Sequence, residues 1–166
     1  MTKEPSDTLR FLPVGLDVRS KNCVVVGGGS VGTRKAITLT RAGADVTVVS
    51  PAVTDELAEL IAAGRVRWVQ DSFREEQLDG AFLAVAATDD DDRNAAVART
   101  ALQNGALACD ASSAERSQLI FGALLEGDDV TIAVFTGGRD PAQARRARDQ
   151  IAHLIDQDRK FKPHGG

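Results

Sequence analysis

Short apolar runs recur along the first two thirds of the chain, most of them bounded by glycine, aspartate or asparagine. Runs of this length that are rich in Val and Ala are typical of strands. The run "AFLAVAAT" has no polar residue before its last position, which is typical of a strand buried on both faces. The pattern predicts strands at 23–27, 45–50, 66–70, 81–88 and 106–111.

Amphipathic stretches separate these runs and predict helices at 31–42, 54–64 and 92–103. Each is followed by, or ends at, a glycine, the residue that most readily adopts the left-handed conformation after a helix. Strands that alternate with helices imply right-handed crossovers. The predicted fold is therefore α/β, a Rossmann-like doubly wound parallel sheet.

The pattern changes after residue 117. Two apolar runs within 118–138 flank "EGDD", which predicts a β-hairpin. Asp140 as a cap and Pro141 at the first helical position then predict a helix. This gives four parts: a disordered N-terminus, an NAD-binding Rossmann domain, a hairpin–helix segment and a tail, at 1–10, 11–113, 114–158 and 159–166.

The hairpin is too apolar to be exposed on both faces, and an isolated hairpin is only marginally stable. We therefore expect the hairpin–helix segment to pack against a second copy of the chain and to form a homodimer.

The composition of the 166 residues is that of a globular protein, with 43% hydrophobic and 27% charged residues. A net charge of −4 argues against a general nucleic-acid-binding protein, which needs a basic face. No apolar run is long enough for a membrane span and no signal peptide opens the chain, so a cytoplasmic location is expected. Cys23 and Cys109 lie in apolar runs as small buried hydrophobes, and the two cysteines and two histidines make no metal site.

The motif that carries chemistry is G-x-G-x-x-G, formed by Gly27, Gly29 and Gly32 between a predicted strand and a predicted helix. The first glycine permits a tight turn, the second lets a pyrophosphate approach the backbone, and the third allows close packing of helix and strand. The helix N-terminus then faces the phosphates. A glycine-rich turn that holds no ligand is the alternative, and a mononucleotide P-loop is excluded because no Gly-Lys-Ser/Thr follows.

The end of the second predicted strand leaves the choice of cofactor open. NAD-binding Rossmann folds usually place an Asp or Glu there to hold the ribose hydroxyls. This chain has Val49, Ser50 and Pro51 there, with neither a carboxylate nor an arginine for a 2′-phosphate. Thr88 ends the fourth predicted strand at the edge of the sheet where ligands bind, and the aspartates at 89–92 are explained as cap and first turn of the next helix.

Three segments together, "FLPVGLDVRSKNCVVVGGGSVGTRKA", "AVAATDDDDRN" and "TIAVFTGGRDPAQAR", resemble the siroheme synthase family, in particular its precorrin-2 dehydrogenase/sirohydrochlorin ferrochelatase module. The likeness runs from about residue 11 to 155. It implies NAD-dependent dehydrogenation of precorrin-2 to sirohydrochlorin, with a homodimer built through the segment after the Rossmann part. It also implies NAD contacts at Ser30, Val31, Pro51 and Ala52, and it favours NAD over NADP.

Two departures from the family pattern bear on catalysis. The family's proposed acid/base Asp follows the fifth strand, where this chain has Ser112, with Asp110 two residues earlier. On an extended segment these two side chains share a face, so Asp110 is the predicted acid/base and Ser112 a positioning residue whose loss costs much less. The alternative for Asp110 is an exposed or capping aspartate. The relatives also continue into a helical domain that helps to enclose the tetrapyrrole, which this sequence does not reach.

A basic cluster opens the last helix and predicts where the carboxylate-rich precorrin-2 binds, since arginine forks suit carboxylates. The predicted substrate-binding residues are Arg139, Arg145 and Arg148, of which the last two share a helix face. The alternative is a solvated basic face that also includes Arg146.

Two rival functions remain open from the sequence. The first is a non-catalytic NAD-binding sensor or assembly subunit, which the missing Asp and the missing helical domain favour. The second is metal insertion into sirohydrochlorin alone, because in the family both reactions share one pocket.

Overall fold

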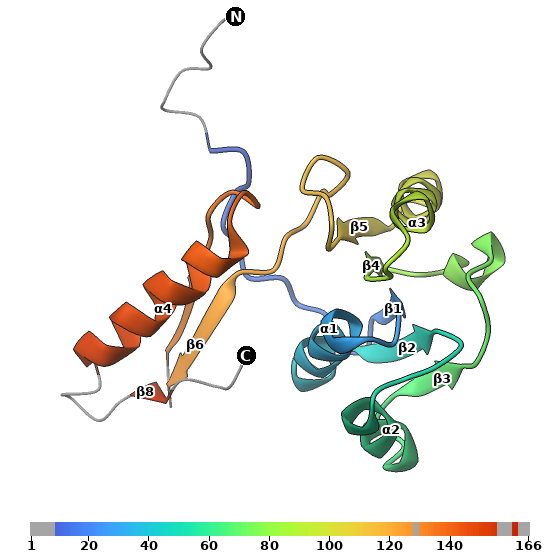
Figure 1. Cartoon of the computed structure of the whole chain (residues 1–166), viewed down its shortest axis with the longest axis horizontal. Coiled ribbons are helices and arrows are strands. Elements are labelled where there is room, and N and C mark those ends of the chain that lie inside the picture. The colour runs from blue at the N-terminus through green and yellow to red at the C-terminus, as the bar shows by residue number, and fades with distance from the viewer. Residues whose placement is uncertain (1–8, 128–129, 156–160, 163–166) are drawn as a thin grey trace, which may run out of the picture. The chain divides into compact units, whose positions relative to one another are not determined.

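The fold is built on a five-stranded sheet, seen in the computed structural model, which describes residues 9–127, 130–155 and 161–162. The strands run in the order β3-β2-β1-β4-β5, and every neighbouring pair is parallel (Figure 1). They are β1 (Asn22–Val26), β2 (Asp45–Val49), β3 (Arg67–Val69), β4 (Leu83–Ala86) and β5 (Leu107–Asp110). The strand order reverses between β1 and β4, as in a doubly wound fold, so the fold prediction is confirmed.

Helices cover both faces of this sheet. In Figure 1 the sheet is seen nearly end-on, with α1 (Ser30–Arg41) and α2 (Asp55–Ala62) on one side. On the other side lie α3 (Asp91–Gln103) and the short 3₁₀ helix η1 (Glu75–Leu78). The sequence did not predict η1, because one turn is too short to show a 3.6-residue pattern.

The strands β1 and β4 are almost wholly apolar because they lie in the middle of the sheet, where both faces are covered. Every residue of β4 is buried, and in β1 only the first residue is partly exposed. Cys23 and Cys109 are buried free thiols, and burial raises the pKa of both to about 11. Their interpretation as small buried hydrophobes is confirmed.

A second, smaller unit follows the sheet. Its strands β6 (Ala123–Gly127), β7 (Thr131–Val134) and β8 (Phe161–Lys162) form an antiparallel sheet in the order β7-β6-β8, and α4 (Pro141–Ile155) packs on β6 and β7. The Asp140 carboxylate accepts the N–H of Gln143 at 2.8 Å, so the predicted cap is present. The hairpin and the helix were both predicted.

The observed boundaries differ from the predicted ones at several places. Residues 14–119 form one compact unit, and the described residues of 9–13 and 120–162 form another. The apolar run that starts at residue 118 becomes a strand only at Ala123, and the predicted turn residues Asp128 and Asp129 lie outside the described residues. So do residues 1–8 and most of the predicted tail.

Residues 161–162, which we expected in the tail, form β8 instead. They pair with β6 through the backbone, with Gly127 opposite Phe161. Backbone pairing over two residues leaves no side-chain pattern in the sequence, which is why the prediction was wrong there. Within the described part of the chain, none of the helices combines the length and the apolar run that crossing a bilayer requires.

Candidate dinucleotide site

The connection from β1 into α1 needs three of its glycines for its own folding. Gly27 has φ +119°, and a Cβ on it would lie 2.2 Å from the carbonyl oxygen of Ala87, just after β4. A Cβ on Gly32 would lie 1.9 Å from the carbonyl oxygen of Gly27. Both values are far below van der Waals contact, so these positions tie α1 closely to the sheet. The next glycine, Gly28, is equally confined, with a Cβ 2.1 Å from the Ala52 carbonyl oxygen.

Gly29 is different from its neighbours. Nothing lies within 4 Å of a Cβ built on it, and its φ of −77° and ψ of −173° suit any residue. The fold of the chain therefore does not require a glycine here. A side chain at this position would project into the space before α1, and glycine keeps that space open for a ligand to reach the backbone.

The N-terminus of α1 also lacks the capping of the other helices. No side chain caps it and its first turn has no acidic residue. In contrast, Thr54, Asp90 and Asp140 each accept a backbone N–H at the start of α2, α3 and α4. The first N–H groups of an α-helix have no carbonyl partner within the helix, so those of Ser30 and Val31 are donors for an external anion.

A pocket of about 390 Å³ opens beside this turn, over the carboxyl ends of β1, β2 and β4. The predicted cofactor residues that line it are Gly27, Gly29, Ser50, Pro51, Ala52 and Thr88. The predicted residues Ser30 and Val31 begin α1 beyond the lining, and Gly32 is buried beneath it. The pocket is also lined by residues that the sequence analysis missed, Asp71, Ser72, Phe73, Asp89 and Arg93. Four of them come from the irregular segments after β3 and β4, where no pattern in the sequence marks them, and Arg93 lies in the first turn of α3.

The segment after β2 is held firmly at the pocket wall. The hydroxyl of Ser50 donates to the carbonyl oxygen of Ala52 at 2.7 Å, and the indole N–H of Trp68 donates to the carbonyl oxygen of Ser50 at 2.9 Å. The backbone N–H of Thr54 donates to the carbonyl oxygen of Gly28 at 3.1 Å, which ties the two loops together. Strand β2 ends at Val49, so Ser50 lies directly after it rather than within it.

On the other side of the pocket, Asn94 fixes Thr88. The Asn94 side-chain oxygen accepts the backbone N–H and the hydroxyl of Thr88 at 3.0 and 2.7 Å, and its amide donates to the Thr88 carbonyl oxygen at 3.0 Å. Asn94 is 1% exposed and was not among the site residues predicted from the sequence. The sequence signal that could have found it is an asparagine on the same helix face as apolar residues that are buried.

Asp110 and Ser112 meet, although not in the way the sequence predicted. Strand β5 ends at Asp110, so the two residues do not share an extended segment. Instead the chain turns back, and the Asp110 Oδ1 accepts the Ser112 backbone N–H at 2.9 Å and its hydroxyl at 2.6 Å. Such a turn around an aspartate is a local side-chain-to-backbone motif.

Arg116 completes this arrangement. Its Nε donates to the Asp110 Oδ2 at 2.6 Å, and its Nη2 donates to the Asp91 Oδ1 at 2.5 Å. The Asp110 side chain is 0% exposed, whereas the Asp91 side chain is 70% exposed. Hydrogen bonding and charge hold the pKa of Asp91 below and that of Arg116 above their usual values. Asp110 is thus a covered carboxylate with Arg116 and Ser112 as partners, and not an exposed or capping one.

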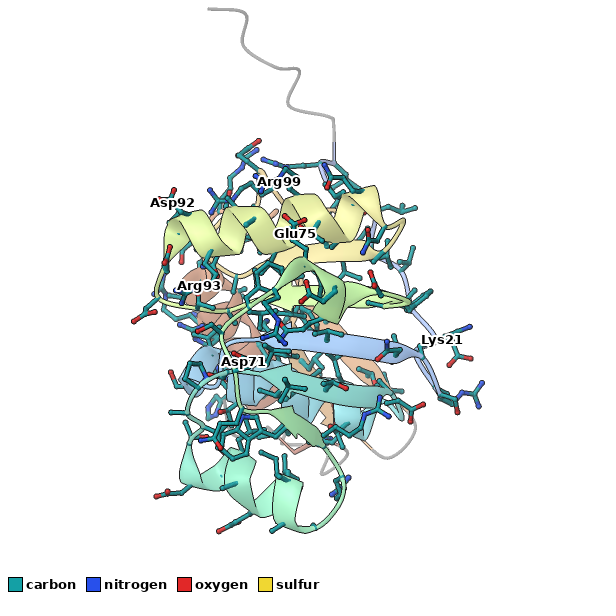
Figure 2. All side chains as sticks on the ribbon, turned by 90° about the vertical axis from the view of Figure 1, so that its right-hand side faces the viewer. Lys21, Asp71, Glu75, Asp92, Arg93 and Arg99 are labelled. Carbon is teal, nitrogen blue, oxygen red and sulfur yellow. The ribbon has the colours of Figure 1, made fainter. Side chains whose placement is uncertain are left out.

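Ser112 links this network to the pocket wall. The residue is exposed, and its hydroxyl oxygen lies 3.2 Å from the Asn94 amide nitrogen. A continuous chain of hydrogen bonds therefore runs from Thr88 through Asn94 and Ser112 to Asp110. Figure 2 shows Asp92 and Arg93 of the first turn of α3 at the end of the sheet opposite Lys21, where the strands terminate.

The predicted substrate-binding arginines belong to the second unit. Arg139 and Arg145 are exposed, while the Arg148 side chain is 11% exposed and donates to Asp149 at 2.9 and 2.7 Å. Arg146 forms a long ion pair of 3.7 Å with Asp140. Among the described residues, no group of three or more His, Cys, Asp or Glu side chains is arranged to hold a metal ion.

Comparison with known proteins agrees with this geometry. Residues 14–123 match the family model described as "Putative NAD(P)-binding". The chain is 38% identical over 147 residues to siroheme synthase 1 of Pectobacterium atrosepticum, and 40% identical to the siroheme synthase of Methylobacillus flagellatus. Each alignment covers 89% of this chain but only 31% and 32% of the relative, so the chain spans about a third of the length of these synthases.

Among solved structures, the chain is similar to one titled "SirC, precorrin-2 dehydrogenase". The TM-score is 0.79 at 29% identity, over 90% of this chain and 73% of the other. The resemblance to siroheme synthases that the sequence motifs indicated is confirmed by these matches.

Proposed function

This chain belongs to the family described as "Putative NAD(P)-binding", and from that premise we propose that it dehydrogenates precorrin-2 to sirohydrochlorin with NAD as hydride acceptor. The observation that carries the proposal is the uncapped start of α1, with the open space at Gly29 beside a pocket. A nicotinamide dinucleotide is the cofactor that this family and this geometry support.

The residues present fit such a cofactor. The backbone of the turn at 27–32, with the N–H groups of Ser30 and Val31, suits the pyrophosphate. Ser50, Pro51 and Ala52 form the wall at the end of β2, where the adenosine half of a dinucleotide lies in this fold. Thr88 lies across the pocket, held in place by Asn94. When bound, the cofactor accepts the hydride that leaves the tetrapyrrole.

Loss of a hydride from precorrin-2 is accompanied by loss of a proton, and we assign the proton to the pair Ser112 and Asp110. Because the Asp110 side chain is 0% exposed, we propose that a substrate proton reaches it through the hydroxyl of Ser112, an exposed residue, 2.6 Å away. Arg116 supplies the opposite charge on the far oxygen of the carboxylate. The sequence assigned this role to Asp110 alone, and burial adds Ser112 as the group that faces the substrate.

The carboxylates of precorrin-2 need cations, and we propose Arg139, Arg145 and Arg148 for this role. Arg139 and Arg145 are exposed, which supports the proposal, whereas Arg148 must first leave Asp149. Arginine binds a carboxylate through two parallel hydrogen bonds, which orients as well as attracts it.

We further propose a homodimer formed through the hairpin and α4. Strands β6 and β7 leave most of their apolar side chains only partly buried within the chain, which supports the proposal. Light scattering at micromolar concentration should give the mass of a dimer, and a monomer at all concentrations would refute it. A cytoplasmic location stays a prediction from the sequence.

The direct test of the activity mixes the purified protein with precorrin-2 and NAD under exclusion of oxygen and follows the absorbance of NADH. We expect NADH and sirohydrochlorin to form in equal amounts. NAD binding without turnover would refute the dehydrogenase and favour the alternative of an NAD-binding sensor or assembly subunit. The observation behind that alternative is that Ser112 stands where the siroheme synthase family has its proposed acid/base Asp. Addition of Co²⁺ or Fe²⁺ to preformed sirohydrochlorin tests the chelatase activity separately.

A further inference from the structure

The pocket holds a carboxylate that comes from β3 rather than from β2. Dinucleotide folds that take NAD usually carry an Asp or Glu at the end of β2, where it binds the ribose hydroxyls of the adenosine. This chain has Ser50 and Pro51 there, yet Asp71, two residues after β3, lines the same pocket.

Backbone hydrogen bonds bring Asp71 next to the end of β2. The carbonyl oxygen of Val69 accepts two N–H groups, that of Ser50 at 3.1 Å and that of Asp71 at 2.9 Å. Since both amides bind one oxygen atom, Asp71 leaves β3 directly beside Ser50. The Gln70 side chain adds a hydrogen bond of 3.3 Å to the Pro51 carbonyl oxygen, which further joins the two strand ends.

The carboxylate is oriented and still has room for a ligand. Its Oδ1 accepts the N–H of Ser72 at 2.7 Å, and its Oδ2 pairs with the guanidinium of Arg74. A carboxylate has about four lone-pair positions, so these two partners leave others for a ribose hydroxyl. The Asp71 side chain is 39% exposed, and Figure 2 shows it toward the same end of the sheet as Arg93.

The guanidinium of Arg74, next to Asp71, does not make this side of the pocket positive for a ligand. Arg74 is turned toward Asp71 and also donates to Glu76 at 2.8 Å, and it is not part of the pocket lining. A 2′-phosphate placed at the end of β2 would therefore meet the Asp71 carboxylate, whereas a 2′-hydroxyl would donate to it.

We propose that Asp71 is the residue that selects NAD over NADP in this chain, in place of the usual carboxylate at the end of β2. The inference rests on the proposed dinucleotide site and makes Asp71 the acceptor for the adenosine ribose hydroxyls. It needs no contribution from the precorrin-2 chemistry, so it is testable by cofactor binding alone.

The experiment compares NAD and NADP binding by isothermal titration calorimetry in the parent and in Asp71→Asn. We expect the parent to prefer NAD, since the carboxylate accepts from one cofactor and repels the other. In Asp71→Asn, NAD binding should weaken roughly tenfold and NADP binding should strengthen by a similar factor, the usual size of one charged hydrogen bond. The single tryptophan, Trp68, contacts the Ser50 carbonyl and gives a second readout by fluorescence.

Two further variants control this result. Asp45→Asn removes an exposed carboxylate at the opposite, amino-terminal end of β2 and should leave both affinities unchanged. Asp71→Asn with Arg74→Gln also removes the cation that the single variant releases. We expect part of the gain in NADP affinity to remain, because the repulsion by Asp71 is still absent, while NAD binding stays weak.

The outcomes separate this inference from the proposed function. If Asp71→Asn keeps the NAD:NADP ratio of the parent, or if the parent prefers NADP, Asp71 is not the selecting residue, although the dinucleotide site stands. If the folded parent binds neither cofactor, the proposed function fails and the inference fails with it.

Discussion

Helices α1 and α3 begin at equivalent positions in the fold, but their N-termini differ in capping and in charge. Each helix follows a central parallel strand, β1 or β4, at the same edge of the sheet. At α1 the cap is a glycine, with no capping side chain and no acidic residue in the first turn. At α3 the cap is Asp90, the first turn adds Asp91 and Asp92, and Arg116 binds Asp91.

This difference indicates which of the two helix N-termini binds a ligand. Both helix ends attract negative charge through their free N–H groups and their dipole. At α3 the chain supplies that charge itself, and hydrogen bonds connect Thr88 through Asn94 and Ser112 to Asp110. At α1 the chain supplies none, and this is the arrangement expected where an external pyrophosphate completes the structure.

The largest effect on NAD binding should come from filling the space before the uncapped N-terminus of α1, which we call the open end; the capped N-terminus of α3, with the network from Thr88 to Asp110, is the closed end. Gly29→Val places a branched side chain in the space before α1 and should reduce NAD binding by more than about 100-fold, because the pyrophosphate needs that space. The backbone conformation at Gly29 suits any residue, so the melting temperature should change little. Calorimetry with NAD and a thermal melt measure the two effects.

Gly32→Val is the matched comparison. Its Cβ would lie 1.9 Å from the Gly27 carbonyl oxygen, so this variant should lose the fold together with the binding. Wild-type NAD affinity in folded Gly29→Val would contradict the assignment of the phosphate site.

The closed end should affect turnover and not cofactor binding. Asp110→Asn should lower the rate of precorrin-2 oxidation by about 100-fold, the common range for a lost acid or base, with NAD affinity nearly unchanged. The sequence predicted a much smaller loss for Ser112→Ala. Because Asp110 is fully covered and Ser112 is the exposed link to it, we now expect the two losses to agree within about tenfold.

Single-turnover kinetics with NAD already bound measure these rates. Full activity of Asp110→Asn would refute the proton role and leave the proton to solvent or to the carboxylates of the substrate. A large loss for Asp110→Asn beside a negligible one for Ser112→Ala would mean that the substrate reaches Asp110 without Ser112.

A third change gives the N-terminus of α1 an acidic residue in its first turn, as the N-terminus of α3 has. Ser30→Asp adds a carboxylate to the first turn of α1, and should stabilise the helix by about 0.5 kcal/mol while it repels the pyrophosphate. NAD binding should weaken by roughly tenfold, with Ser30→Asn as the uncharged control. The loss should shrink at high salt, and an unchanged affinity in Ser30→Asp would argue against phosphates at this helix end.

The smallest effect concerns acid stability at the closed end. Arg116 holds the pKa of Asp91 below its ordinary value of 3.8, so the pair stabilises the folded state above about that pH. This contribution is lost as the pH falls through the lowered pKa. Denaturant unfolding at a series of pH values should therefore show a shallower acid-side loss in Asp91→Asn than in the parent. Identical profiles would mean that the exposed pair contributes nothing, as many surface ion pairs do.

The sheet and the glycine turn were predictable because their physical causes are local. Buried strands need apolar runs, and a tight turn with close helix packing needs glycine, so Gly27 and Gly32 are visible in the sequence. Capping is local as well, which is why Asp140 was predicted as a cap.

The wall of the site was less predictable because its contacts join distant segments. Arg116 meets Asp91 across 25 positions, and Asn94 meets Ser112 across 18. Asp71 reaches the pocket through a turn after a three-residue strand, which has too few residues for a pattern. The meeting of Asp110 and Ser112 was predicted from extended geometry, whereas a turn produces it.

The central claim is that the open N-terminus of α1 receives the dinucleotide phosphates, and backbone amide resonances test it most directly. We would record ¹H–¹⁵N spectra of the protein during a titration with NAD. The account predicts the largest shifts at the amides of residues 28–32, with small shifts in the first turn of α3. Shifts concentrated at α3, or none at residues 28–32 on saturation with NAD, would contradict it.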